Sequence, residues 1–299
     1  MDQLPGAALR RGESAAASSA PVAAARIELR RLRTQEEYAA CVELQKEIWG
    51  PAFSELVPLT MLKVSQRIGG VTAGAFDADG RLLGFVFGIT GVEDGRLVHW
   101  SDMLAVSEEA RNLGLGRRLK EFQRELLLPL GVERAYWTFD PLVSRNAHLN
   151  LNRLGVRVIE YVPDMYGDTD STLHRGLGTD RFIVVWEIAS EANLTGPPAP
   201  RSGLSDTPIV NLAAGDGDRP AGMGPAPAAA PIVRIQIPAD IQSVQRVSLE
   251  QAGRWRATTR RAFLWYLERG YRVAGFYRDG AAGPCYYTLS RADSPELEG

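Results

Sequence analysis

Apolar and polar residues follow regular periods along the first two thirds of the chain. Residues 25–33 alternate as expected for a strand. Thr34 and Glu37 form a capping-box pair, which predicts a helix through about Trp49. Further on, the pattern predicts a helix over 58–68 and strands over 71–77, 82–92 and 97–106, the first two of these strands joined by a turn at Asp79-Gly80.

A glycine-rich turn at residues 111–116 leads into another helix. The apolar residues of that helix keep helical spacing, at Leu115, Leu119, Phe122, Leu126 and Leu127. The strand before this helix and the strand after it form a β-α-β unit, so we expect the two strands to be parallel. The remaining elements are expected as a strand over 134–139, a helix over 144–154, and strands over 156–162 and 181–188. This order predicts a mixed α/β fold.

Composition divides the chain into four parts. We expect a disordered Ala- and Ser-rich tail over 1–25, an ordered domain over 26–190, a Pro/Gly/Ala-rich linker over 191–230 and a smaller α/β block over 231–291. The pattern of the last block predicts a strand, then helices, then a hairpin. Because this order repeats the first half of the main domain, one hypothesis is a duplicated half-domain, although the same order is common in other folds.

Bulk composition excludes several classes of function. The 299 residues are 45% hydrophobic and 23% charged, as in globular proteins, and a net charge of -2 gives no general attraction to nucleic acid or anionic membranes. No apolar run reaches the ~20 residues of a membrane helix. The two cysteines, Cys41 and Cys285, form no disulfide framework, so we expect a cytoplasmic protein. The three histidines have no metal-ligand spacing, and no metal is expected.

The glycine-rich turn is the segment with the clearest chemistry. It places Gly114 and Gly116 at the start of a helix, where unpaired N–H groups and the helix dipole favour an anion. Arg111, Arg117 and Arg118 add cationic donors, so the turn is predicted to hold a pyrophosphate. A dinucleotide site would need a third glycine where residue 119 is Leu, and a P-loop would need Gly-Lys-Ser/Thr. A tight turn without a ligand is the alternative.

The run Arg111-Asn-Leu-Gly-Leu-Gly116 resembles the (Arg/Gln)-x-x-Gly-x-(Gly/Ala) acyl-CoA motif of the GNAT superfamily, and the predicted element order matches that fold. Other runs resemble a bacterial subgroup of predicted acetyltransferases: WTFDPL at 137–142, NA at 146–147, NLNRLG at 150–155, YG at 166–167, GTDRF at 178–182 and, in its C-terminal extension, WRATTRRAF at 255–263 and GYRV at 270–273. The resemblance implies a central mixed sheet flanked by helices. It also implies an acyltransferase that moves an acetyl or succinyl group from CoA to a primary amine of a small molecule, such as an amino acid, by direct attack in a ternary complex.

The same resemblance implies a set of cofactor-binding residues. Backbone amides of residues 113–117 would hold the CoA pyrophosphate, and the edge of the strand before the turn would pair with the pantetheine amides. A bulge near Leu104 or Ala105 is expected to open a slot for the acyl group. The residues implied for acetyl-CoA or another acyl-CoA are Met103, Leu104, Val106, Arg111, Asn112, Leu113, Gly114, Leu115, Gly116, Arg117, Arg118 and Asn146.

The catalytic groups are less clearly indicated. Asp102 is the first candidate for the base that deprotonates the amine, because it lies on the strand that approaches the thioester, with His99 expected on the opposite face. Asp140 is a second candidate, or it serves only as a cap or turn residue. Family members often carry a tyrosine general acid where this chain has Leu151. Tyr166 would then protonate the thiolate, or water does so, or catalysis is lost.

Several alternatives stay open at this stage. Arg181 is expected either to bind a substrate carboxylate or to hold its own loop. The chain is expected to be an enzyme of the acyltransferase class that transfers groups other than aminoacyl groups. The main alternative is a non-catalytic acyl-CoA-binding or regulatory module, and a third possibility is a protein-lysine acetyltransferase. The expected partners are an acyl-CoA and a small amine, without nucleic acid or membrane, and a homodimer is an open alternative to a monomer.

Overall fold

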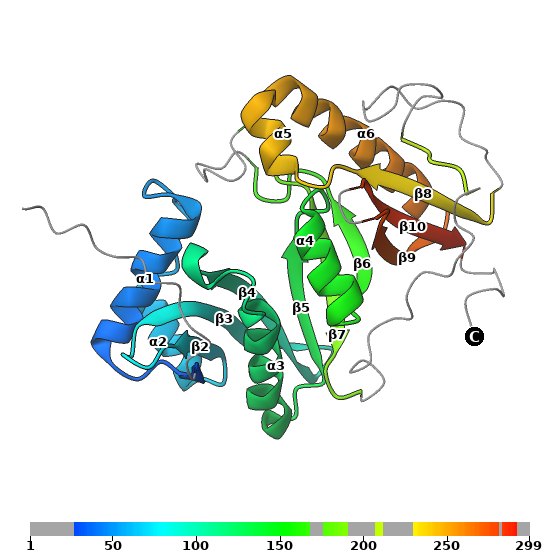
Figure 1. The fold of residues 1–299 in the computed structure, drawn as a ribbon. Helices are drawn as coiled ribbons and strands as arrows, with labels where there is room; N and C mark the ends of the chain where they lie inside the picture. The colour runs from blue at the N-terminus through cyan, green and yellow to red at the C-terminus, as the bar shows by residue number, and fades with distance from the viewer. Residues whose placement is uncertain (1–26, 168–175, 191–206, 212–229, 281–282, 292–299) are drawn as a thin grey trace, which may run out of the picture.

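The computed structural model describes residues 27–167, 176–190, 207–211, 230–280 and 283–291. The predicted tail over 1–25 and most of the predicted linker over 191–230 lie outside the described residues. The described part contains a seven-stranded sheet with helices on both faces and, beside it, a three-stranded sheet with its own helices (Figure 1). The predicted α/β architecture of the main block and the smaller C-terminal block is therefore confirmed.

The large sheet has the strand order β1-β2-β3-β4-β5-β7-β6. Only β4 and β5 are parallel, as the β-α-β unit predicts, and every other neighbouring pair is antiparallel. The strands are β1 (Glu28–Arg31), β2 (Val71–Phe76), β3 (Leu82–Glu93), β4 (Arg96–Val106), β5 (Arg134–Phe139), β6 (Arg157–Val162) and β7 (Arg181–Glu187).

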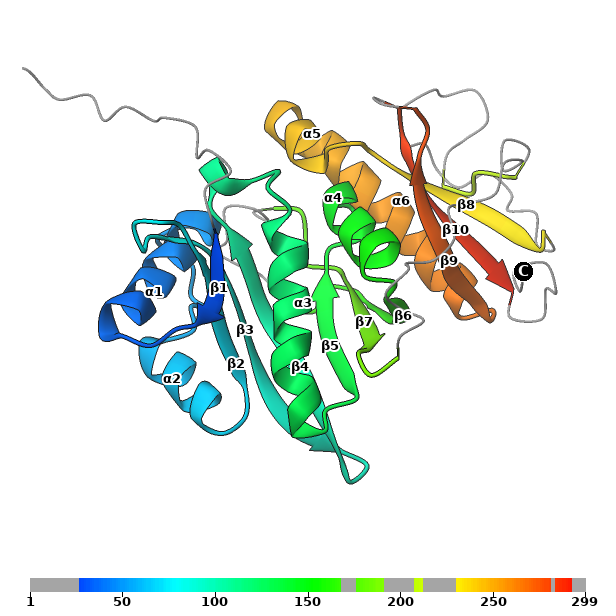
Figure 2. The same ribbon diagram turned by 60° about the horizontal axis from the view of Figure 1, so that its bottom comes forward.

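Alternate side chains of the central strands enter two cores on opposite faces of this sheet. Phe85 and Met103 belong to the core under α1 (Gln35–Trp49) and α2 (Leu59–Arg67), whereas Val86 belongs to the core under α3 (Leu115–Leu127). The capping box that predicts α1 is present, since the Thr34 hydroxyl accepts from Glu37 N and the Glu37 carboxylate accepts from Thr34 N. Figure 2 shows α3 in front of the central strands.

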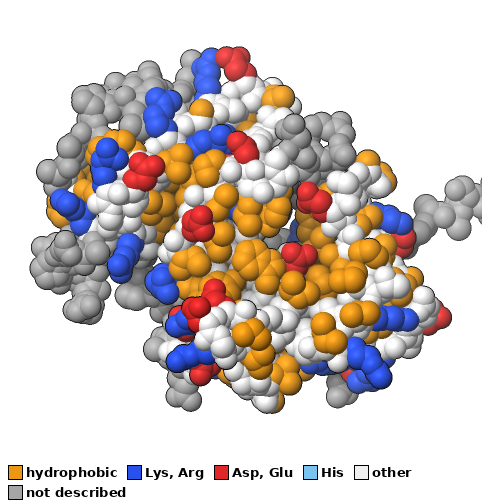
Figure 3. Space-filling view, turned by 180° about the vertical axis from the view of Figure 1, so that it is seen from behind, with side chains coloured by type: hydrophobic (Ala, Val, Ile, Leu, Met, Phe, Trp, Pro, Cys, Tyr) orange, Lys and Arg blue, Asp and Glu red, His pale blue; other side chains and the backbone are white. Residues whose placement is uncertain are grey.

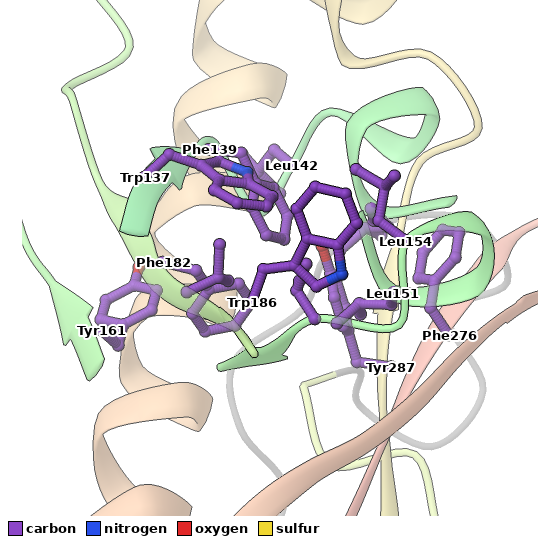
Figure 4. Close-up of a cluster of buried hydrophobic side chains, with 14 of the residues drawn as sticks. Trp137, Phe139, Leu142, Leu151, Leu154, Tyr161, Phe182, Trp186, Phe276 and Tyr287 are labelled. Atoms are coloured by element: carbon purple, nitrogen blue, oxygen red, sulfur yellow. The ribbon is translucent and has the colours of Figure 1, made fainter. Parts of the chain in front are cut away.

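After β5, the chain forms the short helix α4 (Ser144–Ala147) and then a π-helical turn (His148–Arg153). The predicted helix over 144–154 is therefore present but not uniformly α-helical. Leu151 is 4% exposed and packs in the core beneath this turn, together with Trp137, Leu154 and Phe276 (Figure 4).

The C-terminal block is joined to the main sheet through a shared core. It consists of β8 (Ile232–Ile237), α5 (Ile241–Val247), α6 (Leu249–Leu267), β9 (Tyr271–Arg278) and β10 (Cys285–Arg291). The Phe263 ring of α6 lies 5.4, 4.8 and 5.3 Å from the rings of Tyr161, Phe182 and Tyr287. Aromatic rings from β6, β7, α6 and β10 therefore form one cluster, part of which is shown in Figure 4.

The pairing in the small sheet does not support a duplicated half-domain. Its strand order is β8-β10-β9, so the first strand pairs with the second strand of the hairpin. In the main domain, β1 pairs with β2, which is the first strand of its hairpin. The two blocks share an order along the chain but differ in how the strands are connected.

The surface opposite to the view of Figure 1 is apolar over its middle. Hydrophobic side chains gather there with single Asp and Glu side chains among them, while Lys and Arg side chains lie mostly toward the edges (Figure 3). Among the described residues, no helix has the length and apolar character that crossing a membrane requires.

Candidate functional site

Strands β4 and β5 pair over only part of their length. Residues 98–100 of β4 pair with residues 134–136 of β5, although β4 continues to Val106 and β5 to Phe139. Beyond Trp100 and Tyr136 the two strands separate toward their C-terminal ends (Figure 1). Backbone groups that would otherwise complete the sheet are thus left on the facing edges, and an extended ligand can pair with such an edge. We call this opening the β4–β5 split.

A β-bulge lies where the split begins. The register between β3 and β4 shifts so that Ser101 and Asp102 together face the single residue Gly88. A bulge bends its strand and increases the local twist, which here turns β4 away from β5. The bulge expected near Leu104 or Ala105 is therefore placed wrongly by the sequence interpretation. Gly88 is needed at this position, because a Cβ atom there would lie 2.5 Å from the Trp100 carbonyl oxygen.

The start of α3 lies at the open end of the split and has no cap from a side chain. Gly114 is the N-cap residue, with a left-handed backbone at φ 70° and ψ 13°, and no acidic residue is present in the first turn. Asn112 is also left-handed, with φ 70°. A Cβ atom on Gly114 would meet nothing within 4 Å, so the approach to these amides is open. The first-turn N–H groups can therefore receive an anion.

Arginine side chains surround this helix start. Arg111 and Arg117 form exposed pairs with Glu108 at 3.5 Å and Glu121 at 2.7 Å, which are weak in water. Arg118 donates to the Ile27 carbonyl oxygen at 3.1 Å and thus ties α3 to the start of β1.

Arg145 is a further cation that the sequence interpretation missed. Burial lowers its pKa, and the nearby positive charge of Arg111 lowers it further. Two guanidinium groups close enough to repel each other can together bind an anion. The sequence could have indicated Arg145, because this residue directly precedes Asn146, which the family resemblance implies as a CoA contact. Asn146 lies in the same short helix, α4, and its side chain is partly buried.

Asp102 lies in the bulge, with an exposed side chain. Surrounding protein raises the pKa of its carboxyl group, and a hydrogen bond from the Trp100 side chain opposes this effect only in part. A carboxylate with a raised pKa is a better proton acceptor than an ordinary one. His99 is fully buried and bonded to Thr90 Oγ1 and to Gln123 Nε2, both at 3.0 Å, so the two residues have separate environments.

Tyr166 lies beside the part of β5 that faces the split. Its hydroxyl group is 2.9 Å from Thr138 Oγ1, and Thr138 comes two residues after the last residue of β5 that pairs with β4. The Tyr166 side chain is 38% exposed, so a ligand can reach it. The Arg181 guanidinium group lies 5.2 Å from the centre of the Tyr166 ring.

Asp140 and Arg181 are held inside the protein instead of facing a ligand. Asp140 is 4% exposed, and its two oxygens accept from Arg256 of α6 at 3.0 and 2.6 Å. Asp140 Oδ1 also accepts from Leu142 N at 2.8 Å. Arg181 is 7% exposed and donates to the Asp180 carbonyl oxygen at 2.9 Å. The structure thus favours the alternatives in which Asp140 is a structural anion and Arg181 holds its own loop.

Lys120 is the second residue that the sequence interpretation missed. It is 2% exposed, and its Nζ atom lies 2.7 Å from Ser101 Oγ and 3.6 Å from the centre of the Trp137 ring. Burial lowers the pKa of its amino group well below the usual value. The signal was its spacing: Gly116, Lys120, Gln123 and Leu127 fall at i, i+4, i+7 and i+11, on one face of α3.

No group of three or more His, Cys, Asp or Glu side chains suited to a metal ion is found in the described ranges. The polar groups around the split include backbone amides, arginines, hydroxyl groups, carboxylates and a lysine.

The chain matches no protein-family model and no curated protein. Among solved structures, it is similar to a chain of the NatC complex bound to Gag peptide and CoA, with a TM-score of 0.44 and 16% identity over 54% of this chain and 98% of that chain. It is also similar to the ribosomal-protein-S18-alanine N-acetyltransferase of Escherichia coli, with a TM-score of 0.42 and 17% identity over 55% of this chain and 94% of that chain. A third similar structure is yncA of Salmonella typhimurium, solved with its cofactor acetyl-CoA. Its TM-score is 0.44, with 16% identity over 60% of this chain and 99% of that chain.

Proposed function

We propose that this chain is an acyl-CoA-dependent N-acyltransferase that moves an acetyl or succinyl group to a primary amine of a small molecule, such as an amino acid. The observation that carries this proposal is the juxtaposition of an uncapped helix start with an open strand edge. Gly114 and the first turn of α3 offer amides to a diphosphate, and the edge of β4 beside it offers amides and carbonyl groups to an extended chain.

The described residues fit both the diphosphate and the pantetheine arm of CoA. The diphosphate would bind to the amides of residues 113–117, with Arg111 and Arg145 supplying positive charge. The pantetheine arm would pair with β4 over residues 103–106, beyond its last pair with β5. With the phosphates at the open end of the split, the acyl end points toward the bulge at Ser101 and Asp102, where the strands meet.

The simplest route is direct attack of the amine on the thioester. Asp102 would take the proton from the attacking nitrogen, and its raised pKa suits that role. A backbone N–H of the bulged segment would stabilise the oxyanion of the tetrahedral intermediate. Tyr166 is the hydroxyl group beside β5 that would protonate the leaving thiolate, since Leu151 cannot do so.

A non-catalytic acyl-CoA-binding module is the second candidate. It is favoured by Leu151, whose apolar side chain is packed in the core at the position where family members often carry a tyrosine acid. This candidate predicts binding of acyl-CoA without any release of thiol.

The two candidates are separated by one measurement on the full-length protein. Acetyl-CoA and succinyl-CoA are each incubated with a panel of amino acids and other primary amines, and free thiol is followed together with the mass of the acylated product. An amine-dependent release of thiol with a matching amide supports the transferase. Binding of both CoA esters by calorimetry, with no release across the panel, would leave only the binding module.

A further inference from the structure

The chain just after β6 lies beside the chain just before β7. Met165 N donates to the Thr179 carbonyl oxygen at 3.2 Å, and Tyr166 N donates to Thr179 Oγ1 at 3.1 Å. Thr179 Oγ1 in turn donates to the Gly167 carbonyl oxygen at 3.0 Å. Three backbone groups around Tyr166 are thus bound to Thr179, so the place of Tyr166 depends on how these two segments are held together.

Two aspartates join the same segments. Asp180 Oδ1 accepts from Asp164 N at 3.1 Å, and Asp164 Oδ1 accepts from Thr179 N at 3.4 Å. Asp180 is fully buried, and Asp164 has a left-handed backbone with φ 44°, a conformation whose cost the surrounding contacts must offset. The junction therefore places two negative charges side by side, and these repel each other unless a cation lies between them.

Arg260 of α6 is a cation in that position. Its Nη2 atom donates to Asp164 Oδ1 at 2.7 Å and also to Asp180 Oδ1, and its Nε atom donates to Asp180 Oδ2 at 2.9 Å. The hydrogen bond from Arg260 lowers the pKa of the Asp164 carboxyl group, so this group is ionised at neutral pH. Gly178 leaves room for the contact, because a Cβ atom there would lie 2.7 Å from Asp164 Oδ1 and 3.4 Å from Arg260 Nη2.

The place of Tyr166 decides where its hydroxyl group lies relative to the β4–β5 split. That hydroxyl group is 2.9 Å from Thr138 Oγ1, on the part of β5 that no longer pairs with β4. A single residue separates Tyr166 from Asp164, so a shift of Asp164 away from Arg260 moves the tyrosine with it. A displacement of about 1 Å in a group that takes part in a reaction can slow the reaction by about 100-fold.

We propose that Arg260 is a positioning residue for the acyl transfer: by binding Asp164 and Asp180, it holds the Tyr166 hydroxyl group beside the split. This inference rests on the proposed function, in which Tyr166 protonates the leaving thiolate. It gives the C-terminal block a part in the reaction, because α6 supplies the arginine from outside the large sheet. Arg260 acts through Tyr166 and transfers no proton itself.

Steady-state kinetics on the full-length protein test this role. Thiol release from acetyl-CoA is followed with whichever amine of the panel is acylated fastest. Arg260→Met should lower kcat by about 10- to 100-fold and change the KM for acetyl-CoA by less than about 3-fold, because the start of α3 is untouched. Arg260→Lys keeps the positive charge and should recover a large part of the loss. Arg261→Met, which removes the exposed neighbouring arginine of α6, is the control and should leave kcat unchanged.

A double variant separates positioning from a general loss of structure. Because Arg260 acts through Tyr166, adding Arg260→Met to Tyr166→Phe should slow the reaction no further than Tyr166→Phe alone. Losses that multiply in the double variant would show that Arg260 acts independently of Tyr166 and would overturn the proposal. Equal kcat values in Arg260→Met and Arg261→Met would overturn it as well.

Amide hydrogen exchange reports on the same contact without any activity. Arg260→Met should speed the exchange of the peptide that contains Tyr166 and leave the peptides of β4 and α3 unchanged. Asp164→Asn removes the half-exposed carboxylate but keeps the buried Asp180 pair, so it gives the same readout if Arg260→Met folds poorly.

Unchanged exchange around Tyr166 in both variants, or faster exchange throughout both, would contradict the positioning role. The proposed function fails separately, if the unchanged protein binds CoA but releases no thiol with any amine. Faster exchange around Tyr166 would in that case show that Arg260 makes a structural contact only.

Discussion

His99 shows how burial decides the charge state of a single residue. Its ring is fully buried, and both nitrogens have partners, Thr90 Oγ1 and Gln123 Nε2. Burial, helped by the nearby Lys120 amino group, lowers its pKa to about 3. The ring is therefore neutral at physiological pH and serves to orient Gln123 and Thr90 beneath the bulge.

We expect His99 to make the fold sensitive to mild acid. The unfolded chain protonates this residue near pH 6.5, whereas the folded chain does so only near pH 3, so the free energy of unfolding decreases as the pH falls through that window. The loss between pH 7 and pH 4.5 should be roughly 2–3 kcal/mol. Urea unfolding should show a flatter pH dependence in His99→Gln, and equal slopes in both proteins would contradict the assignment.

A second prediction for a single residue concerns the role of Asp102 as the base. If it deprotonates the attacking amine, Asp102→Asn should slow amine acylation by about 100-fold or more while the affinity for CoA is unchanged. Because the pKa of Asp102 is raised, activity should rise with pH as this carboxyl group ionises, and the variant should lose that limb of the profile. Asp79→Asn, in the exposed β2–β3 turn, is the control and should leave the rate and its profile unaltered.

Helix α3 combines two functions that depend on different parts of it. Its first turn is uncapped and open to an anion, and its middle places Lys120 and Gln123 under the bulge of β4. The apolar residues Leu115, Leu119 and Leu127 anchor the helix in the core on this face of the sheet. A rigid, well-packed helix therefore fixes the distance between the proposed diphosphate site and the bulge of β4.

A charge at the start of α3 should prevent CoA binding. Gly114→Glu puts a carboxylate beside the amides proposed to hold the diphosphate, and we expect the affinity for CoA to fall by at least about 100-fold. Gly131→Glu is the matched control, since Gly131 also has a left-handed backbone (φ 79°) with open space around its Cβ position, but lies at the other end of the helix. Calorimetry that shows the same affinity in both variants would place the diphosphate elsewhere.

At the scale of the whole molecule, one buried and one half-buried ion pair join the C-terminal block to the main sheet. Arg256 of α6 binds Asp140 at the end of β5, and Arg260 of α6 binds Asp180 just before β7. Asp180 also accepts from the Tyr161 hydroxyl group and from Asp164 N. Asp140 follows β5 and Asp180 precedes β7. Each is thus paired with an arginine of α6 that lies more than 70 residues further along the chain.

Loss of one partner should destabilise the protein strongly. Arg256→Met removes the bidentate partner of buried Asp140 and leaves the Arg181 guanidinium group at 3.9 Å, and we expect the free energy of unfolding to fall by about 3 kcal/mol. Arg254→Met, which removes an exposed pair with Glu250 on the same helix, should change it by less than about 0.5 kcal/mol. Urea denaturation compares the two variants, and similar losses would show that the Asp140 pair does not stabilise the docking of α6.

The sequence by itself determined what depends on near neighbours along the chain. The capping box before α1, the hairpin turn at Asp79-Gly80 and the glycine-led start of α3 are set by a few consecutive residues, because caps, turns and helix starts involve local hydrogen bonds and backbone angles. The parallel pairing of β4 with β5 follows from the crossover helix α3 between them, which returns the chain to the end of the sheet where β4 began.

Only the tertiary structure decided which polar groups are buried and what they face. The bulge at Ser101 and Asp102, the burial of Lys120 between two strands and the pairing of Asp140 with Arg256 all depend on contacts between distant segments. Charge states follow from those contacts, because desolvation and ion pairing act through space and not along the chain. A lysine that looks like a solvent-facing helix residue is thus buried beside the site, and burial lowers the pKa of its amino group.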